Sequence, residues 1–117
     1  MKQSLEIQFI NKREIRMGAE FNICKLNIIG KVKPNLSGDD FQDILCWSLD
    51  FNFLALVRWN INNNNPGFNV YIINCKQNDV KKSDRIEGCC ESIEWVNNHF
   101  LYKCLKGRET IAGKVIV

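Results

Sequence analysis

The sequence predicts an α+β fold, with a mostly antiparallel, strongly curved or partly closed sheet of about seven strands and one α-helix packed against it. Several segments alternate apolar and polar residues with the period of two that is typical of strands. Only one segment carries apolar residues at helical spacing behind capping residues. Short turns rich in Asn, Gly and Pro separate most segments, which favours antiparallel neighbours.

Length and composition indicate a single domain over residues 1–117. A chain of 117 residues can bury a core without metal or disulfide staples, and 45% hydrophobic and 25% charged residues are ordinary for a globular protein. The longest fully apolar run, residues 53–57, is far below the ~20 residues of a membrane span. The N-terminal stretch carries charges throughout and has no secretory signal, so we expect a cytoplasmic protein that does not enter a membrane.

The first two strands are predicted at residues 5–10 and 20–32. Apolar and polar residues alternate in the first strand, which indicates one buried face. The charged stretch between them connects the two strands. Pro34 and the polar residues around it end the second strand.

The predicted helix lies within SGDDFQDILCWSLDF, residues 37–51, and spans about 10 to 12 residues. Ser37 and Asp40 stand at capping-box spacing, and Asp39 is an alternative cap. Acidic residues in a first helical turn also suit the positive end of the helix dipole. One helical stripe collects the apolar residues Phe41, Ile44, Leu45 and Leu49.

A central strand is predicted at residues 53–61, because this segment is apolar on both faces and needs a cover on each side. The helix is expected to be one of the covers. The stretch NNNNPG, residues 62–67, makes the turn into a strand at residues 68–75. Residues 76–84 are predicted to form a loop.

A β-hairpin is predicted around Asn97-Asn98, since Asn suits both central positions of a two-residue type I′ turn. Such a turn places Trp95 opposite Phe100 and Ile93 opposite Tyr102 on one core-facing surface. The predicted strands are residues 85–96 and 99–105 of the hairpin and a last strand at residues 110–117.

Two adjacent cysteines, Cys89 and Cys90, lie in the first of these strands. Successive strand residues face opposite sides, so the pair cannot bind one metal ion while the strand stays regular. Their Cα atoms, ~3.8 Å apart, are also closer than the usual ~4.4 Å minimum for a disulfide. Gly88 before them is a candidate β-bulge. We expect no metal site and buried free thiols as packing, with a reactive thiol as the alternative; the other cysteines are Cys24, Cys46, Cys75 and Cys104.

No catalytic motif is present: the sequence has no Gly-x-Ser-x-Gly, no phosphate-binding Walker loop and no Gly-x-Gly-x-x-Gly. His99 is the one histidine, and its place beside a hairpin turn favours a solvated, idle side chain. Arg58 lies mid-strand, where it could grip a carboxylate or phosphate, but pairing with a neighbouring acid or stacking on Trp59 is favoured. We therefore expect no enzyme activity, no catalytic residues and no cofactor.

The charge pattern points to a binding surface. The net charge is +3, but the basic residues are dispersed, which disfavours nucleic-acid binding. Acidic residues gather in the predicted helix and in the hairpin, and they would form one acidic face if these elements pack together. Such a face would dock a basic partner, whereas ordinary solvated charge is the alternative reading. The residues predicted to bind the partner are Asp39, Asp40, Asp43, Glu87, Glu91 and Glu94.

As a whole, the chain resembles the small immunity proteins of bacterial contact-dependent growth inhibition systems. These systems deliver polymorphic toxins. The resemblance rests on size, helix-plus-sheet make-up, a composition rich in Asn, Ile and Lys, and the absence of catalytic motifs. It implies a cytoplasmic toxin inhibitor that neutralises a cognate toxin domain, often a nuclease, in a one-to-one protein complex. A departure is the net basic charge, because nuclease inhibitors are often strongly acidic. The alternative function is a small β-rich nucleic-acid-binding module.

Overall fold

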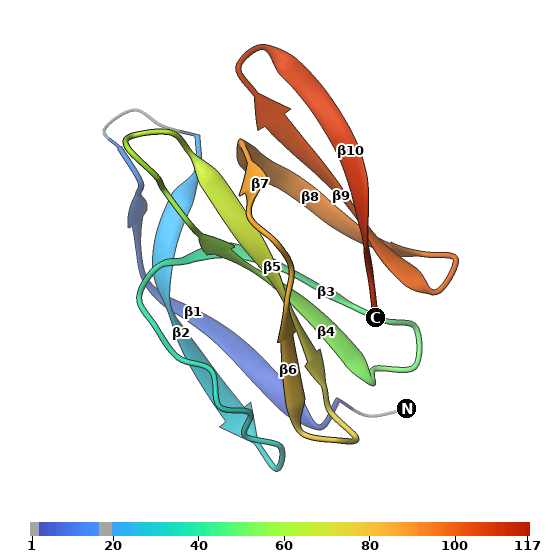
Figure 1. The fold of residues 1–117 in the computed structure, drawn as a ribbon. Coiled ribbons are helices and arrows are strands. Elements are labelled where there is room, and N and C mark those ends of the chain that lie inside the picture. The colour runs from blue at the N-terminus through green and yellow to red at the C-terminus, as the bar shows by residue number, and fades with distance from the viewer. Residues whose placement is uncertain (1–2, 17–19) are drawn as a thin grey trace.

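The computed structural model describes residues 3–16 and 20–117, and this part of the chain is all-β, with ten strands and no helix. The strands form two open antiparallel sheets (Figure 1). The large sheet has the order β1-β2-β3-β4-β5-β6, with β7 also paired to β5, and the small sheet has the order β10-β9-β8. Neither sheet is closed or strongly curled. The predicted α+β class, with a strongly curved or partly closed sheet and a packed helix, is therefore wrong.

Most strands pair antiparallel with the strand that follows them in the sequence. Their bounds are β1 Leu5–Glu14, β2 Asn22–Gly30, β3 Phe41–Trp47, β4 Phe53–Trp59, β5 Gly67–Asn74, β6 Asp79–Lys82, β7 Ile86–Glu87, β8 Cys89–Val96, β9 His99–Lys106 and β10 Glu109–Ile116. The predicted connection after the first strand is still strand as far as Glu14, and its residues 17 and 18 lie outside the described residues.

The helix predicted within residues 37–51 is absent, and this segment instead contains β3. Phe41 lies opposite Arg58 of β4 and Leu45 opposite Leu56, with a bulge between these pairs. A helix would bury its whole apolar stripe, yet Leu49 at the end of that stripe is 87% exposed. The segment FQDILCW is rich in aromatic and β-branched residues, which favour strands, and pairing with β4 decides the outcome. The described residues therefore contain no helix long enough to cross a membrane.

Strands β4 and β5 lie at the centre of the molecule, as the doubly apolar sequence of β4 predicts. On one face, Ala55 and Val57 pack with Phe100 and other residues of the small sheet. On the other face, Leu54 and Leu56 pack with residues of the β1–β2 hairpin. The second cover is thus a β-hairpin, where the sequence predicted a helix. A single residue pair, Cys24 opposite Phe41, joins β2 to β3.

Both predicted asparagine turns are confirmed. Asn97 and Asn98 have φ angles of 49° and 64°, as a type I′ turn requires, and Trp95 lies opposite Phe100 across it. Ile93 lies opposite Tyr102, also as predicted. In the earlier turn, backbone hydrogen bonds join residues 62 and 65, and the two asparagines between them have positive φ.

The predicted strand at residues 85–96 is two strands in different sheets. Gly88, with a φ of 110°, separates β7 of the large sheet from β8 of the small sheet. A Cβ at Gly88 would lie 2.6 Å from the carbonyl oxygen of Leu105, so glycine is required at this corner. The bulge predicted near Gly88 lies further on, at Glu91, between the register pairs of Cys90 and Ser92.

The predicted loop at residues 76–84 contains one further strand, β6. Its only apolar residue, Val80, lies opposite Ile73 of β5. One apolar residue among charged neighbours gives too weak an alternation to be recognised in the sequence. Lys81 and Lys82 suit this strand to the edge of the sheet, where charge discourages further pairing.

Candidate functional site

Three of the six acidic residues predicted to bind a partner are ion-paired within the chain. Asp40 accepts a hydrogen bond from Nε of Arg58 at 2.8 Å. Asp43 lies 3.5 Å from Lys12, and its carboxylate also accepts a hydrogen bond from Asn22. Glu87 lies 3.0 Å from Nζ of Lys106, and this pairing holds the pKa of Glu87 below its usual value. The ion pairs found among the described residues are Asp40–Arg58, Asp43–Lys12 and Glu87–Lys106.

The other three predicted residues, Asp39, Glu91 and Glu94, are exposed. The structure does bring their elements together, because β3 lies beside β8. The side chain of Gln42 donates a 2.6 Å hydrogen bond to the carbonyl oxygen of Cys90 across this contact. The acidic residues are nevertheless interleaved with the basic residues of the ion pairs, so they do not form one uniformly negative face.

Arg58 takes the structural role that the sequence favoured, although with different rings. It pairs with Asp40, as expected of a neighbouring acid. Its guanidinium lies 4.9 Å from the ring centroid of Phe41 and 5.6 Å from that of Tyr71. These cation–π contacts replace the predicted stacking on Trp59. The same pair explains Asp40, which binds a cation and caps no helix.

All six cysteines are free thiols. Among the described residues, no group of three or more His, Cys, Asp or Glu side chains is placed to hold a metal ion. Burial raises the pKa of Cys90 to about 12 and that of Cys24 to about 11. These thiols are therefore protonated at neutral pH and serve as core packing. The ring nitrogen Nδ1 of His99 lies 3.2 Å from the carbonyl oxygen of Asn97.

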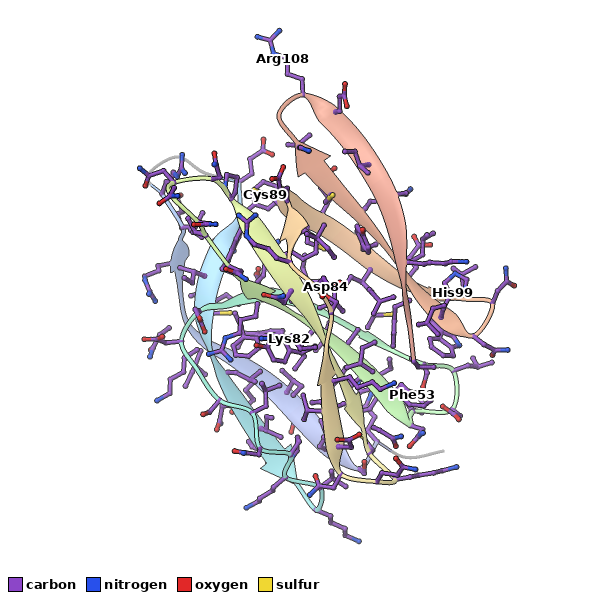
Figure 2. All side chains as sticks on the ribbon, in the orientation of Figure 1. Phe53, Lys82, Asp84, Cys89, His99 and Arg108 are labelled. Atoms are coloured by element: carbon purple, nitrogen blue, oxygen red, sulfur yellow. The ribbon has the colours of Figure 1, made fainter. Side chains whose placement is uncertain are left out.

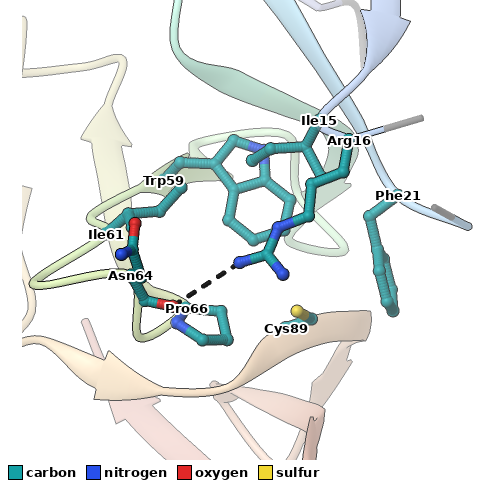
Figure 3. A pocket seen from close by; sticks show the side chains of 8 residues that line it. All are labelled: Ile15, Arg16, Phe21, Trp59, Ile61, Asn64, Pro66 and Cys89. Atoms are coloured by element: carbon teal, nitrogen blue, oxygen red, sulfur yellow. Dashed lines mark hydrogen bonds between the residues drawn. The ribbon is translucent and has the colours of Figure 1, made fainter.

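A pocket of about 240 Å³ lies between the large sheet and the start of β8 (Figure 3). Its polar groups are Arg16 just after β1, Asn64 in the β4–β5 turn and Cys89 at the start of β8. The guanidinium of Arg16 reaches across the pocket, where it makes a long hydrogen bond of 3.5 Å to the carbonyl oxygen of Asn64. The apolar wall consists of Ile15, Phe21, Trp59, Ile61 and Pro66.

Hydrogen bonds fix the walls of this pocket. The indole N–H of Trp59 donates to the carbonyl oxygen of Asn22 at 2.9 Å, and the Phe21 ring packs edge-on against the indole. Arg85 donates to the carbonyl oxygens of Asn60 and Asn65 and so clamps the β4–β5 turn. A wall held in this way is ready to receive a ligand without first being ordered.

Cys89 faces this pocket while its neighbour Cys90 faces the core. Burial raises the pKa of Cys89, and the positive charge of Arg16 opposes that rise. The net shift is upward, so the thiol stays protonated at neutral pH. The side chain therefore serves the pocket as a small, weakly polar surface, and no activating group makes it a nucleophile.

The sequence did not reveal the pocket, because its residues come from four separate segments. Arg16 and Phe21 lie in the connection between β1 and β2, Trp59 is the last residue of β4, and Ile61 follows it. One signal was available: Ile61 and Pro66 are apolar residues on either side of a turn of four asparagines, and Ile61 is 46% exposed. An exposed apolar residue beside a rigid turn is typical of a contact surface.

No family model, no curated protein and no solved structure matches the chain.

Proposed function

We propose that this protein is an immunity protein, which binds a cognate bacterial toxin domain in a one-to-one complex and thereby neutralises it. The proposed toxin is a nuclease of a contact-dependent growth inhibition system, and the complex forms in the cytoplasm. In this proposal the chain catalyses no reaction and acts only through its surface. A stable complex of this kind buries on the order of 1,500 Å² or more.

The observation that carries the proposal is the surface around the start of β8. Cys89 lines an apolar pocket, and Glu91 and Glu94 lie further along the same strand with exposed side chains, whereas Glu87 is ion-paired with Lys106. An apolar centre with a polar, charged rim is the usual anatomy of a protein–protein interface. Exposed carboxylates suit the basic surface that a nuclease presents to its nucleic acid.

The direct test is protection of cells from the toxin. The proposal predicts a toxin gene immediately upstream of the gene for this chain, and the C-terminal domain of its product would be expressed from an inducible promoter, with and without the chain. We expect survival only when the chain is present, together with a one-to-one complex of the two purified proteins by size-exclusion chromatography with light scattering. Growth arrest despite expression of the chain, with no complex at micromolar concentration, would contradict the proposal.

A matched set of charge variants tests the predicted interface. Glu91→Gln and Glu94→Gln remove exposed carboxylates of β8, and Glu109→Gln removes one at the start of β10 as the control. Rim charges act mainly on the association rate, so we expect the β8 variants to associate about three- to tenfold more slowly at low salt. Unchanged rates in both β8 variants would remove these residues from the interface.

A further inference from the structure

The pocket beside Cys89 has the size of a single side chain. Its volume of about 240 Å³ lies below the roughly 300–1,000 Å³ of pockets that hold whole small molecules or cofactors. Hot spots of protein interfaces commonly consist of one aromatic or aliphatic side chain inserted into such a hollow. The size therefore favours an anchor residue of a partner over a cofactor.

The walls define the chemistry of that anchor. Phe21, Trp59 and Ile61 present rings and a branched aliphatic group, which bind apolar surface and aromatic rings. Since Phe21 packs edge-on against Trp59, with ring centroids 6.3 Å apart, an incoming ring can continue this arrangement.

Arg16 favours a negative charge on the group that enters the pocket. It takes part in none of the ion pairs found among the described residues, and it donates a 3.5 Å hydrogen bond to the carbonyl oxygen of Asn64. Its guanidinium therefore retains donors that can bind a carboxylate in a forked geometry. A cation that lines an apolar hollow selects an apolar group with a carboxylate next to it.

We propose that this pocket receives an aromatic or branched aliphatic side chain of a partner polypeptide, with a neighbouring carboxylate bound by Arg16. The assignment rests on the proposed function, since it names the segment of the toxin partner that would be held. The anchoring segment is thus apolar and locally acidic, even where the rest of the partner is basic.

The test uses small peptide-like probes on the full chain, observed by NMR at the indole N–H of Trp59 and the backbone amides of Asn64 and Cys89. N-acetyl-phenylalanine carries the ring and the carboxylate, its amide carries the ring alone, and N-acetyl-alanine carries the carboxylate alone. We expect saturable shifts with the first probe, binding about three- to fivefold weaker with the amide, and no saturation with N-acetyl-alanine. Added salt should reduce the preference for the carboxylate.

Two matched variants separate the pocket from general charge. Arg16→Gln should make the carboxylate and the amide bind equally. Arg108→Gln makes the same change at the exposed β9–β10 turn, which projects away from Cys89, and should leave the preference intact (Figure 2). Folding of both variants is verified by their amide spectra.

Three results would overturn the assignment. These are equal binding of the carboxylate and the amide to the unmodified chain, a preference that survives Arg16→Gln, and the absence of saturable shifts. Tighter binding of benzoate than of N-acetyl-phenylalanine would identify a small-molecule site instead. The probes require no toxin, so the two proposals can fail separately. If the probes do not bind but the chain protects cells, the anchor pocket is wrong and the immunity function stands. If the probes bind as expected but the chain does not protect cells, only the immunity function is wrong.

Discussion

Cys89 and Cys90 are neighbours in the chain but lie on opposite sides of β8. Cys90 is fully buried between the two sheets, where it lies opposite Cys104 of β9. Cys89 is half-buried and lines the pocket beside Arg16. The alternation of a strand thus assigns two identical residues to two environments, one in the core and one at the candidate binding site.

This difference predicts selective alkylation. We expect iodoacetamide to modify Cys89 in the native protein while Cys90 stays protected until the chain unfolds, because only the accessible thiol can be reached. The raised pKa of Cys89 predicts slow modification at neutral pH and a rate that rises toward and beyond pH 9. Fragmentation of the tryptic peptide that holds both residues locates the label. Equal labelling of the two thiols before unfolding would contradict this arrangement.

The buried thiols predict a loss of stability at alkaline pH. Burial raises the pKa of Cys90 to about 12 and of Cys24 to about 11, from 9.0 for an ordinary thiol. Above pH 9.0 the unfolded chain therefore releases these protons while the native chain keeps them, so the free energy of unfolding falls as the pH rises. We expect a loss of about 1 kcal/mol per pH unit from each thiol between pH 9 and 11, and little contribution below about pH 8.

Urea unfolding of the protein and of Cys90→Ala over this pH range checks the alkaline effect. The variant is less stable at every pH, because it lacks buried atoms, but its slope with pH should be smaller by the contribution of one thiol. Identical slopes would show that Cys90 does not titrate in this way. Comparing slopes removes the titration of other side chains that both proteins share.

Gly88 is predicted to be far less replaceable than Gly107. Both have positive φ, 110° and 62°, so alanine is strained at either position. A Cβ at Gly88 would also collide with the carbonyl oxygen of Leu105, whereas nothing lies within 4 Å of one at Gly107. We expect Gly88→Ala to lower the free energy of unfolding by at least ~1 kcal/mol more than Gly107→Ala. Equal losses in urea unfolding would remove the close contact as the cause.

The hairpin turn at Asn97-Asn98 predicts opposite effects for two substitutions at one position. Asn98 has a φ of 64°, which glycine adopts without strain and alanine does not. We expect Asn98→Gly to raise the free energy of unfolding by about 0.5 kcal/mol and Asn98→Ala to lower it by about 1 kcal/mol. Urea unfolding measures both. A loss of stability with glycine would show that the Asn98 side chain holds this turn.

The sequence predicts local structure well where periodicity and turn chemistry agree. The Asn97-Asn98 hairpin and its partners Trp95 and Phe100 are in the predicted register, since a two-residue turn leaves no freedom in pairing. The helix prediction failed because the residues of β3 fit two periods. Phe41 and Leu45 are four apart, which satisfies a helical stripe, and a bulge shifts the register between them in the strand.

The candidate site was harder to predict than the fold, for a physical reason. Its acidic residues are visible in the sequence. Whether an acidic side chain forms an ion pair depends on contacts between segments far apart in the sequence, such as that of Lys106 with Glu87. The pocket depends on Arg16 and Cys89 meeting across 73 positions of sequence, from residue 16 to residue 89. No local pattern encodes that meeting.

Strand β4 has a consequence for how the molecule comes apart. Leu54 and Leu56 belong to one apolar cluster, Ala55 and Val57 to the other, and a single backbone is the partition between them. Neither cluster can unfold and leave the other intact, because the opening of either one exposes a face of β4 to water. The amides of β4 should accordingly be the last to exchange with deuterated solvent, and only when everything opens at once.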